Sequence, residues 1–182
     1  SEDIVREVDR IEGWVRELLG YTQPVAGQRQ AIDANAVLRK SLHDYERELA
    51  KRNVELTAAL GERLPAVRGD AALLGQVVNT LIANAVDAAA DPVRRAARIE
   101  VRSRLAEDAR HVEIDVADNG VGIPEGQLET VFRPFFTTKP RGLGLGLPLA
   151  KRVLERYGAA LEVASTQGVG TTFTIRLAVE GS

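Results

Sequence analysis

Cysteine and methionine are both absent from the 182 residues, and aromatic side chains make up only 4% of them. Without cysteine, the chain cannot form disulfides, zinc–thiolate sites or a thiol nucleophile. Because it also lacks an initiator methionine, we expect the sequence to be a piece of a longer protein. Long uncharged apolar runs are missing too, and a membrane span needs about 18 such residues. We therefore expect no membrane segment in this piece.

An excess of either charge is also missing. Lys and Arg total 24 against 26 Asp and Glu, a net charge of −2. This balance argues against nucleic acid as a partner, because such binding relies on excess positive charge. The first residues, Ser1–Asp3, lack the basic and apolar parts of a signal peptide. We expect a cytoplasmic location, while a membrane anchor elsewhere in the parent protein stays open.

The first 23 residues predict one amphipathic helix. Its apolar residues recur at alternating spacings of four and three, as in a helix that packs along a seam. They are Ile4, Val8, Ile11, Val15 and Leu18. A single helix cannot bury such a seam on itself, so either the main domain or a partner helix must cover it. We divide the chain into a partial dimerisation helix (1–24), a linker (25–33) and a main domain (34–182).

The rest of the chain alternates helical and extended patterns. Helices are predicted over 34–52, from Asp70 to about Val86, and over 148–157. Strands are predicted around 54–58, 99–103, 112–116, 161–163 and 173–179. Because successive strands are joined by tight connections, we expect an α/β fold: a two-layer sandwich with a mixed, mainly antiparallel sheet covered on one face by helices. The long Gly- and Pro-rich segment 118–147, with at most one short helix near 127–132, is typical of a functional loop.

A carboxylate followed by two glycines ends one predicted strand, in the sequence Asp118-Asn119-Gly120-Val121-Gly122-Ile123. Glycine allows a flat ring to approach the backbone closely. The carboxylate can accept a hydrogen bond from an exocyclic amine such as that of adenine. An ordinary Asp-Asn-Gly turn is the alternative interpretation of this motif.

Three alternating glycines, Gly142, Gly144 and Gly146, come directly before the helix predicted at Pro148. Backbone N–H groups at a helix N-terminus form an anion site, and the preceding Lys139 and Arg141 could pair with phosphate. A flexible glycine hinge is the alternative. The phenylalanine-rich segment 132–136 just before this loop is expected either to anchor it as a lid or to form a small buried cluster.

A polar stripe runs along the otherwise apolar helix that follows Asp70. Gln76, Thr80 and Asn84 are four residues apart and therefore lie on one face. An amide oxygen on this face can ligate Mg²⁺ while phosphates and water fill the other positions. A face that is merely solvated is the alternative.

Together and in this order, the motifs resemble the catalytic and ATP-binding domain of sensor histidine kinases. This domain belongs to the Bergerat-fold ATPase superfamily, shared with gyrase, Hsp90 and MutL. Asn84-Ala85 is similar to the N box, 118–123 to the first glycine box, 132–139 to the F box and 142–147 to the second glycine box. The segment 168–173 resembles the terminal G-x-G-T segment. The lid is most similar to the NtrB-like subgroup, and the first helix resembles the second helix of the dimerisation hairpin.

The resemblance implies an ATP-dependent histidine kinase of a two-component system, with ATP and Mg²⁺ as cofactors. A response-regulator receiver domain and a second copy of the parent chain are the implied protein partners. It implies that Asn84 ligates Mg²⁺ and acts in catalysis with Lys139, which reaches the terminal phosphate, while Asp118 binds the adenine amine. The other residues implied to bind nucleotide are Asp87, Gly120, Gly122, Ile123, Arg141, Gly142, Leu143, Gly144, Leu145, Gly146, Leu147 and Thr171.

Two departures from the family pattern bear on the reaction. Thr80 stands where kinases usually carry Asn and where the gyrase-type ATPases carry a Glu general base. Since Thr cannot act as a base, transfer to an outside nucleophile is favoured over hydrolysis. Leu143 replaces a hydroxyl residue of the second glycine box. A gyrase- or MutL-like ATPase and a non-catalytic nucleotide-binding module are the alternative functions.

Both histidines lie outside an acceptor motif. His43 is followed by Asp44 but not by the Asn/Thr-Pro pair of the family, and His111 begins a predicted strand. We expect structural roles for both. It follows that this piece alone would not phosphorylate itself and would need an acceptor supplied by the parent chain or by a separate domain.

Overall fold

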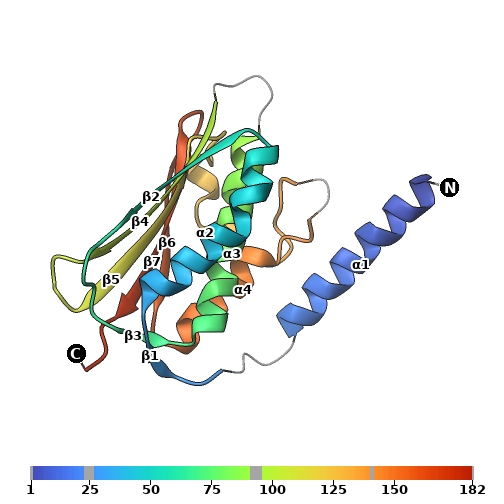
Figure 1. Cartoon of the computed structure of the whole chain (residues 1–182). Coiled ribbons are helices and arrows are strands. Elements are labelled where there is room, and N and C mark those ends of the chain that lie inside the picture. Colours follow the sequence, from blue (N-terminus) through green and yellow to red (C-terminus); the bar gives the residue numbers. More distant parts are fainter. Residues whose placement is uncertain (1, 23–26, 91–95, 140–141, 182) are drawn as a thin grey trace.

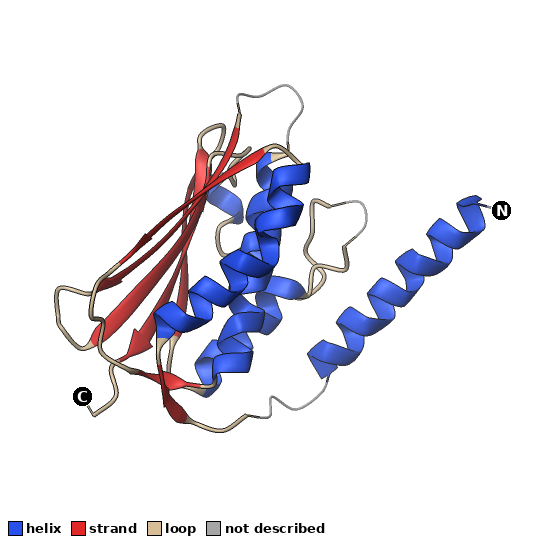
Figure 2. Cartoon of the chain, viewed as in Figure 1, coloured by secondary structure: helices blue, strands red, loops and turns tan. Residues whose placement is uncertain are grey.

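The computed structural model describes residues 2–22, 27–90, 96–139 and 142–181. A five-stranded sheet forms one layer and is covered on one face by helices α2 (Ala34–Lys51), α3 (Ala71–Ala89) and α4 (Gly146–Arg156) (Figures 1 and 2). Its strand order is β2-β4-β5-β7-β6. The bounds are β2 Val54–Leu60, β4 Ala97–Leu105, β5 His111–Asp118, β6 Ala160–Thr166 and β7 Gly170–Ala178. Only the β2–β4 pair of this sheet is parallel, so the predicted mixed, mainly antiparallel sandwich is confirmed.

The two faces of the sheet differ because side chains alternate along each strand. In β5, Val112, Ile114 and Val116 are fully buried beneath the helices. The outer face carries ion pairs instead, and Arg104 contacts both Glu113 and Asp115 there. The apolar core therefore lies only on the helix side, which is also the side that holds the predicted site.

Helix α3 is the centre of this core. Asp70 caps it, accepting a hydrogen bond from the Leu73 backbone N–H at 2.9 Å. Its buried residues are Leu74, Val77, Val78, Leu81, Ile82, Ala85, Val86 and Ala89. By length and composition alone α3 could cross a membrane. Its contacts with α2, α4 and the sheet show instead the packing of a core helix.

Two short strands depart from the sequence expectation. β1 (Gln30–Ile32) pairs antiparallel with β3 (Val67–Gly69) in a separate two-stranded sheet. β1 lies within the segment 25–33 expected as a linker, of which residues 27–33 are described. Strands of three residues are too short to show a period of two, so the pattern did not reveal them.

Two further boundaries differ. α4 begins at Gly146 rather than Pro148, so its first turn includes the last glycine of the loop. The short helix expected near 127–132 is two separate 3₁₀ turns, Glu125–Gln127 and Thr130–Phe132. Helix starts are set by capping contacts that the sequence pattern places only approximately.

Helix α1 (Glu2–Thr22) has no buried residue. Its predicted apolar seam is 41–69% exposed from Ile4 to Leu18. Figure 1 shows α1 standing apart from the sheet, with its C-terminal end beside α4. The main domain therefore does not cover the seam. Of the two coverings that the sequence allowed, packing on the main domain is thus not observed.

Leu81→Ala is expected to lower the free energy of unfolding by about 2–5 kcal/mol, because Leu81 is fully buried in α3 and its loss leaves a cavity. Urea denaturation measures the change. The matched control is Leu105→Ala, whose side chain is 42% exposed and whose loss should cost below about 1 kcal/mol. Equal losses in the two variants would contradict the core described here.

Candidate functional site

Asp118 ends β5 with its side chain on the helix side of the sheet. Its register partners, Ile99 in β4 and Thr171 in β7, are both buried. The carboxylate accepts a hydrogen bond from the Gly120 backbone N–H at 2.8 Å and another from the Thr171 backbone. Burial outweighs these bonds and raises the pKa of Asp118. A carboxylate has acceptor capacity beyond two bonds, so it can also receive an amine of a ligand.

The glycines of this loop are required by the packing of its backbone. A Cβ at Gly120 would lie 2.2 Å from the Ala88 carbonyl oxygen at the end of α3. At Gly122, which has a φ of +71°, a Cβ would lie 2.2 Å from the Thr166 carbonyl oxygen. The loop is thus clamped between α3 and the β6–β7 turn, which fixes the approach to Asp118. The role of Gly122 beside a flat ring stays a prediction.

Ser165 is a residue that sequence reasoning missed. Its hydroxyl accepts from the Ile123 backbone N–H at 2.8 Å and shares a hydrogen bond of 2.8 Å with the Thr171 hydroxyl. The β6–β7 register places Ser165 opposite Thr171. No sequence motif marks a serine in an edge strand, so only the pairing of the strands reveals it. Ile123 and Thr171, both predicted site residues, are thereby joined in one network beside Asp118.

Lys139, the last residue of the F box, reaches across to α3. Its ammonium donates to Asn84 Oδ1 and to Asp87 Oδ2, both at 2.7 Å. Asn84 and Asp87 are three residues apart and so lie on one face of the helix. The structure thus brings together three predicted site residues, although Asn84 and Lys139 are 55 positions apart in the sequence.

These two oxygens fit a small hard cation. They converge on one positive charge, and amide and carboxylate oxygens are the ligands that Mg²⁺ prefers. In the described part of the chain, no group of three or more His, Cys, Asp or Glu could hold a metal by itself. A bound Mg²⁺ would therefore need further ligands from phosphates and water.

The glycine loop leads directly into α4. Gly144 has a φ of +72°, and its carbonyl accepts from the Phe135 N–H at 3.1 Å. Gly146 opens the helix beside Thr80, whose methyl would lie 3.3 Å from an added Cβ. The helix N-terminus and the asparagine face of α3 are therefore neighbours, which suits phosphates bound next to a metal.

Some side chains of the segment 142–147 are packed into the protein rather than exposed. Leu145 is fully buried and Leu147 packs partly against the core, so both side chains serve the fold. The Leu143 N–H contacts Glu17 of α1 at 3.3 Å, an arrangement that the sequence did not indicate. Arg141 lies outside the described residues, and its predicted phosphate contact stays a prediction.

The phenylalanines do not form one anchor. Phe132 packs edge-on against Phe173 of β7, with ring centroids 6.3 Å apart. Phe135 is 62% exposed and has a φ of 66°. Only the first ring of the F box is thus part of the core cluster, and the tip of the segment faces solvent.

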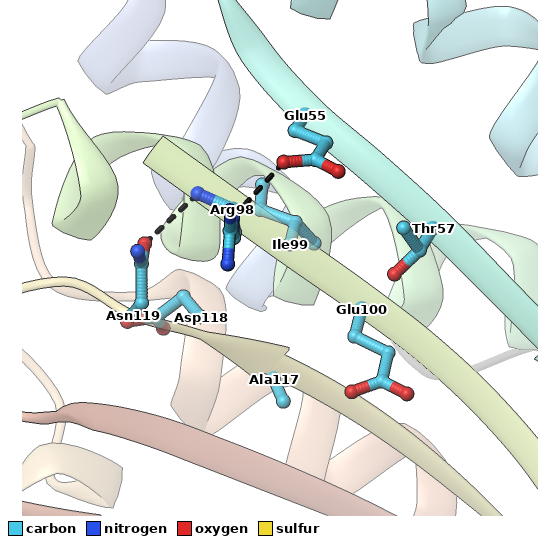
Figure 3. A pocket seen from close by; sticks show the side chains of 8 residues that line it. All are labelled: Glu55, Thr57, Arg98, Ile99, Glu100, Ala117, Asp118 and Asn119. Atoms are coloured by element: carbon cyan, nitrogen blue, oxygen red, sulfur yellow. Dashed lines mark hydrogen bonds and ion pairs between the residues drawn. The ribbon is translucent and has the colours of Figure 1, made fainter. Parts of the chain in front are cut away.

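A pocket of about 490 Å³ lies beside the predicted site rather than in it (Figure 3). Its lining comes from β2, β4 and the end of β5: Glu55, Thr57, Arg98, Ile99, Glu100, Ala117, Asp118 and Asn119. Arg98 pairs with Glu55 at 2.9 Å, and its backbone N–H donates to Asn119 Oδ1 at 2.8 Å. Asn119 thereby fastens the first glycine loop to β4. Of the predicted residues, only Asp118 lines this pocket.

Comparison with known proteins identifies the family. Residues 69–181 match the family described as "Histidine kinase-, DNA gyrase B-, and HSP90-like ATPase". The match spans more than half of the chain, which therefore belongs to this ATPase family, as the motifs predicted.

The curated relatives are sensor kinases. The chain is similar to sensor histidine kinase ZraS of Escherichia coli (strain K12), with 35% identity over 98% of this chain and 37% of that protein. Signal transduction histidine-protein kinase AtoS of the same organism is 31% identical over 97% of this chain and 28% of its own length. The chain thus spans 37% and 28% of the lengths of these two relatives.

Solved structures agree with this assignment. The mycobacterial sensor histidine kinase MprB is 30% identical, with a TM-score of 0.68 over 84% of this chain and 98% of that one. The catalytic domain of histidine kinase ThkA is 25% identical, with a TM-score of 0.73 over 84% of this chain and 96% of that one. The predicted fold class is confirmed by these neighbours.

Asp118→Asn is expected to raise the melting temperature of the ligand-free protein near neutral pH by roughly 2–4 °C, the shift that about 1 kcal/mol produces in a domain of this size. The raised pKa of Asp118 means that folding favours its protonated form. The wild type therefore gains stability relative to the variant as the pH falls through the folded-state pKa of Asp118.

Thermal melts of both proteins between about pH 7 and about pH 4 measure this narrowing difference. Asp44→Asn on the exposed side of α2 is the control. A variant that is less stable than wild type near neutral pH, or a difference that ignores pH, would contradict the burial of a charged carboxylate at position 118.

Proposed function

We propose that this chain is the ATP-binding catalytic part of a two-component histidine kinase, which transfers the γ-phosphoryl group of ATP to a histidine on a helical hairpin. The observation that carries the proposal is the convergence of three groups at the C-terminal half of α3: the buried Asp118, the Asn84–Asp87–Lys139 cluster and the glycine loop that opens α4. The membership in an ATPase family and the sensor-kinase relatives support it.

Each group has a distinct task in this proposal. Asp118 accepts the adenine amine, with Gly120, Gly122, Ile123 and Thr171 shaping the surroundings of the ring. Phosphates bind the backbone N–H groups of 142–147 and the N-terminus of α4. Asn84 ligates Mg²⁺ with Asp87 beside it, and the ion, when bound, would offset phosphate charge.

Lys139 has to leave Asn84 before a metal can bind there, because one amide oxygen cannot receive both cations in the same place. Its ammonium is then free to contact the terminal phosphate as a point charge. Lys139 in this proposal is the residue that senses whether a third phosphate is present.

Transfer is favoured over hydrolysis because a general base is missing at the expected place. The Thr80 hydroxyl, beside Gly146, donates to the Gln76 carbonyl at 3.0 Å and cannot activate water. Phosphoryl transfer itself depends on positioning and charge neutralisation. The nucleophile therefore comes from outside the site.

In this proposal neither histidine of this chain is that nucleophile, because neither lies in an acceptor motif or beside the Asn84–Asp87–Lys139 cluster. His43 is exposed on α2, and His111 pairs with Asp108 at 2.7 Å at the far end of β5 from Asp118. The acceptor is a histidine of the parent protein, so the chain alone would not phosphorylate itself. A response-regulator receiver domain then takes the phosphoryl group in the cytoplasm. The exposed seam of α1, in the dimerisation segment 1–24 of the parent, joins two copies of that protein.

Mixing the chain with ATP labelled at the γ-phosphate, Mg²⁺ and a separate helical hairpin from a related sensor kinase is expected to place acid-labile phosphate on the hairpin. Asn84→Ala and Asp118→Asn should each reduce this transfer at least about tenfold, since each removes a contact worth about 1.4 kcal/mol or more. Asp44→Asn is the control. Vigorous hydrolysis without transfer would identify a gyrase- or MutL-like ATPase instead, and nucleotide binding with neither reaction would identify a non-catalytic module.

Lys139→Met should weaken binding of a non-hydrolysable ATP analogue by about tenfold and binding of ADP by much less, because a charged hydrogen bond to the terminal phosphate is lost. Calorimetry with both nucleotides measures the ratio. Lys40→Met on α2, where Lys40 pairs with Asp44 at 2.9 Å, is the matched control. A ratio unchanged from the wild type would remove Lys139 from the phosphate site.

A further inference from the structure

Helix α1 faces the catalytic domain with a side other than its apolar seam. Its half-buried residues are Arg10, Trp14, Glu17 and Tyr21, at spacings of four, three and four. At about 100° per residue, this stripe is centred roughly 110° around the helix from the seam. Within this stripe Arg10 lies over the Trp14 ring, 4.8 Å from its centroid, while Glu17 and Tyr21 at its C-terminal end make the contacts with the catalytic domain.

Two contacts join this stripe to the site. Glu17 accepts a hydrogen bond from the Leu143 backbone N–H at 3.3 Å. Arg152 of α4 donates to the Tyr21 carbonyl oxygen and lies over the Tyr21 ring, 5.7 Å from its centroid. The C-terminal end of α1 is thus attached both to the glycine loop and to the helix that follows the loop (Figure 1).

The Glu17 carboxylate occupies an anion position. The Leu143 N–H belongs to the second glycine box, where the proposed function places phosphates of the nucleotide. A carboxylate that accepts from this N–H presents negative charge to the loop as a phosphate oxygen would. A triphosphate bound at the same loop needs the same donor and would lie against a like charge, which disfavours both being bound together.

The proposed metal ligands Asn84 and Asp87 are likewise occupied by a charged side chain of this chain. Lys139 holds its positive charge on Asn84 and Asp87, while Glu17 holds its negative charge on the glycine loop. The ligand-free chain therefore fills a site for a cation and an anion with its own cation and anion. Only the anion comes from α1, so only the phosphates compete with the docking of that helix.

We infer that α1 docks on the glycine loop through Glu17 as a substitute for phosphate, and that a nucleoside triphosphate displaces it. This inference rests on the proposed function, because it requires nucleotide phosphates at 142–147. Because linkage is reciprocal, a group that favours docking weakens nucleotide binding by the factor by which nucleotide weakens docking. ATP binding is thereby coupled to release of the helix that leads toward the rest of the parent protein.

Glu17→Ala is expected to bind the imido analogue of ATP with Mg²⁺ about threefold to tenfold more tightly than the wild type, since the competing charged hydrogen bond is gone. Glu12→Ala is the matched control: it removes the same charge from the exposed opposite side of α1. Neither residue is buried, so neither variant should unfold. Calorimetry on the 182-residue chain gives the affinities.

Trp14 supplies a second readout, because it is the only tryptophan of the chain and lies one helical turn before Glu17 on the same side of α1. The ATP analogue is expected to shift its fluorescence toward the red as α1 leaves the domain, in the wild type and in Glu12→Ala. Adenosine, which has no phosphates, should leave the spectrum unchanged at saturation. Glu17→Ala should already show the shifted spectrum without nucleotide.

Equal affinities of the wild type and Glu17→Ala would overturn the inference while leaving the proposed function intact. A Trp14 spectrum that saturating ATP analogue does not move, or that adenosine moves as far, would overturn it as well. If the ATP analogue binds none of the proteins, the proposed function fails and this inference fails with it.

Discussion

The clamping of one loop between two elements governs the geometry of the whole site. Backbone from Asp118 to Gly122 passes between the last turn of α3 and the β6–β7 turn, with no space for a side chain at Gly120. Because β5 lies in the middle of the sheet, with β4 and β7 on either side, the carboxylate that ends it cannot move without shifting both neighbours. Asp118 therefore stays desolvated in the folded protein, and this burial raises its pKa. A rigid acceptor at this point suits the adenine contact proposed for Asp118.

Elements with a long, regular pattern could be predicted from the sequence. α3 and the alternation of β4, β5 and β7 follow from periodicity, and the glycine boxes mark both loops of the proposed site. The residues that the sequence did not reveal are those whose role depends on distant pairing. Ser165 matters because strand register sets it opposite Thr171, and Glu17 matters because α1 folds back onto the lid. Neither relation leaves a local pattern, just as the three-residue β1 and β3 are too short to leave one.

The F box shows the limit of composition as a guide. Three nearby phenylalanines predict a joint anchor, yet the chain reverses at Phe135, whose positive φ turns that ring to solvent, while Phe132 stays on the core. Phe132 therefore attaches the start of this segment to the core. Farther along, Lys139 makes a polar contact with α3 and Leu143 makes one with α1. Polar attachments of this kind exchange readily with polar ligands, whereas a fully inserted aromatic anchor would have to be pulled from the core.

The apolar seam of α1 and the stripe that includes Glu17 and Tyr21 are centred roughly 110° apart around the helix. In the proposed parent protein, α1 would pack against a second copy of this helix along the seam and against its own catalytic domain along the stripe. In the proposed parent dimer, pairing of two α1 helices and release of each catalytic domain would use different residues, so either could change without the other. Under that proposal, a catalytic domain could detach from its helix while the two helices stay paired.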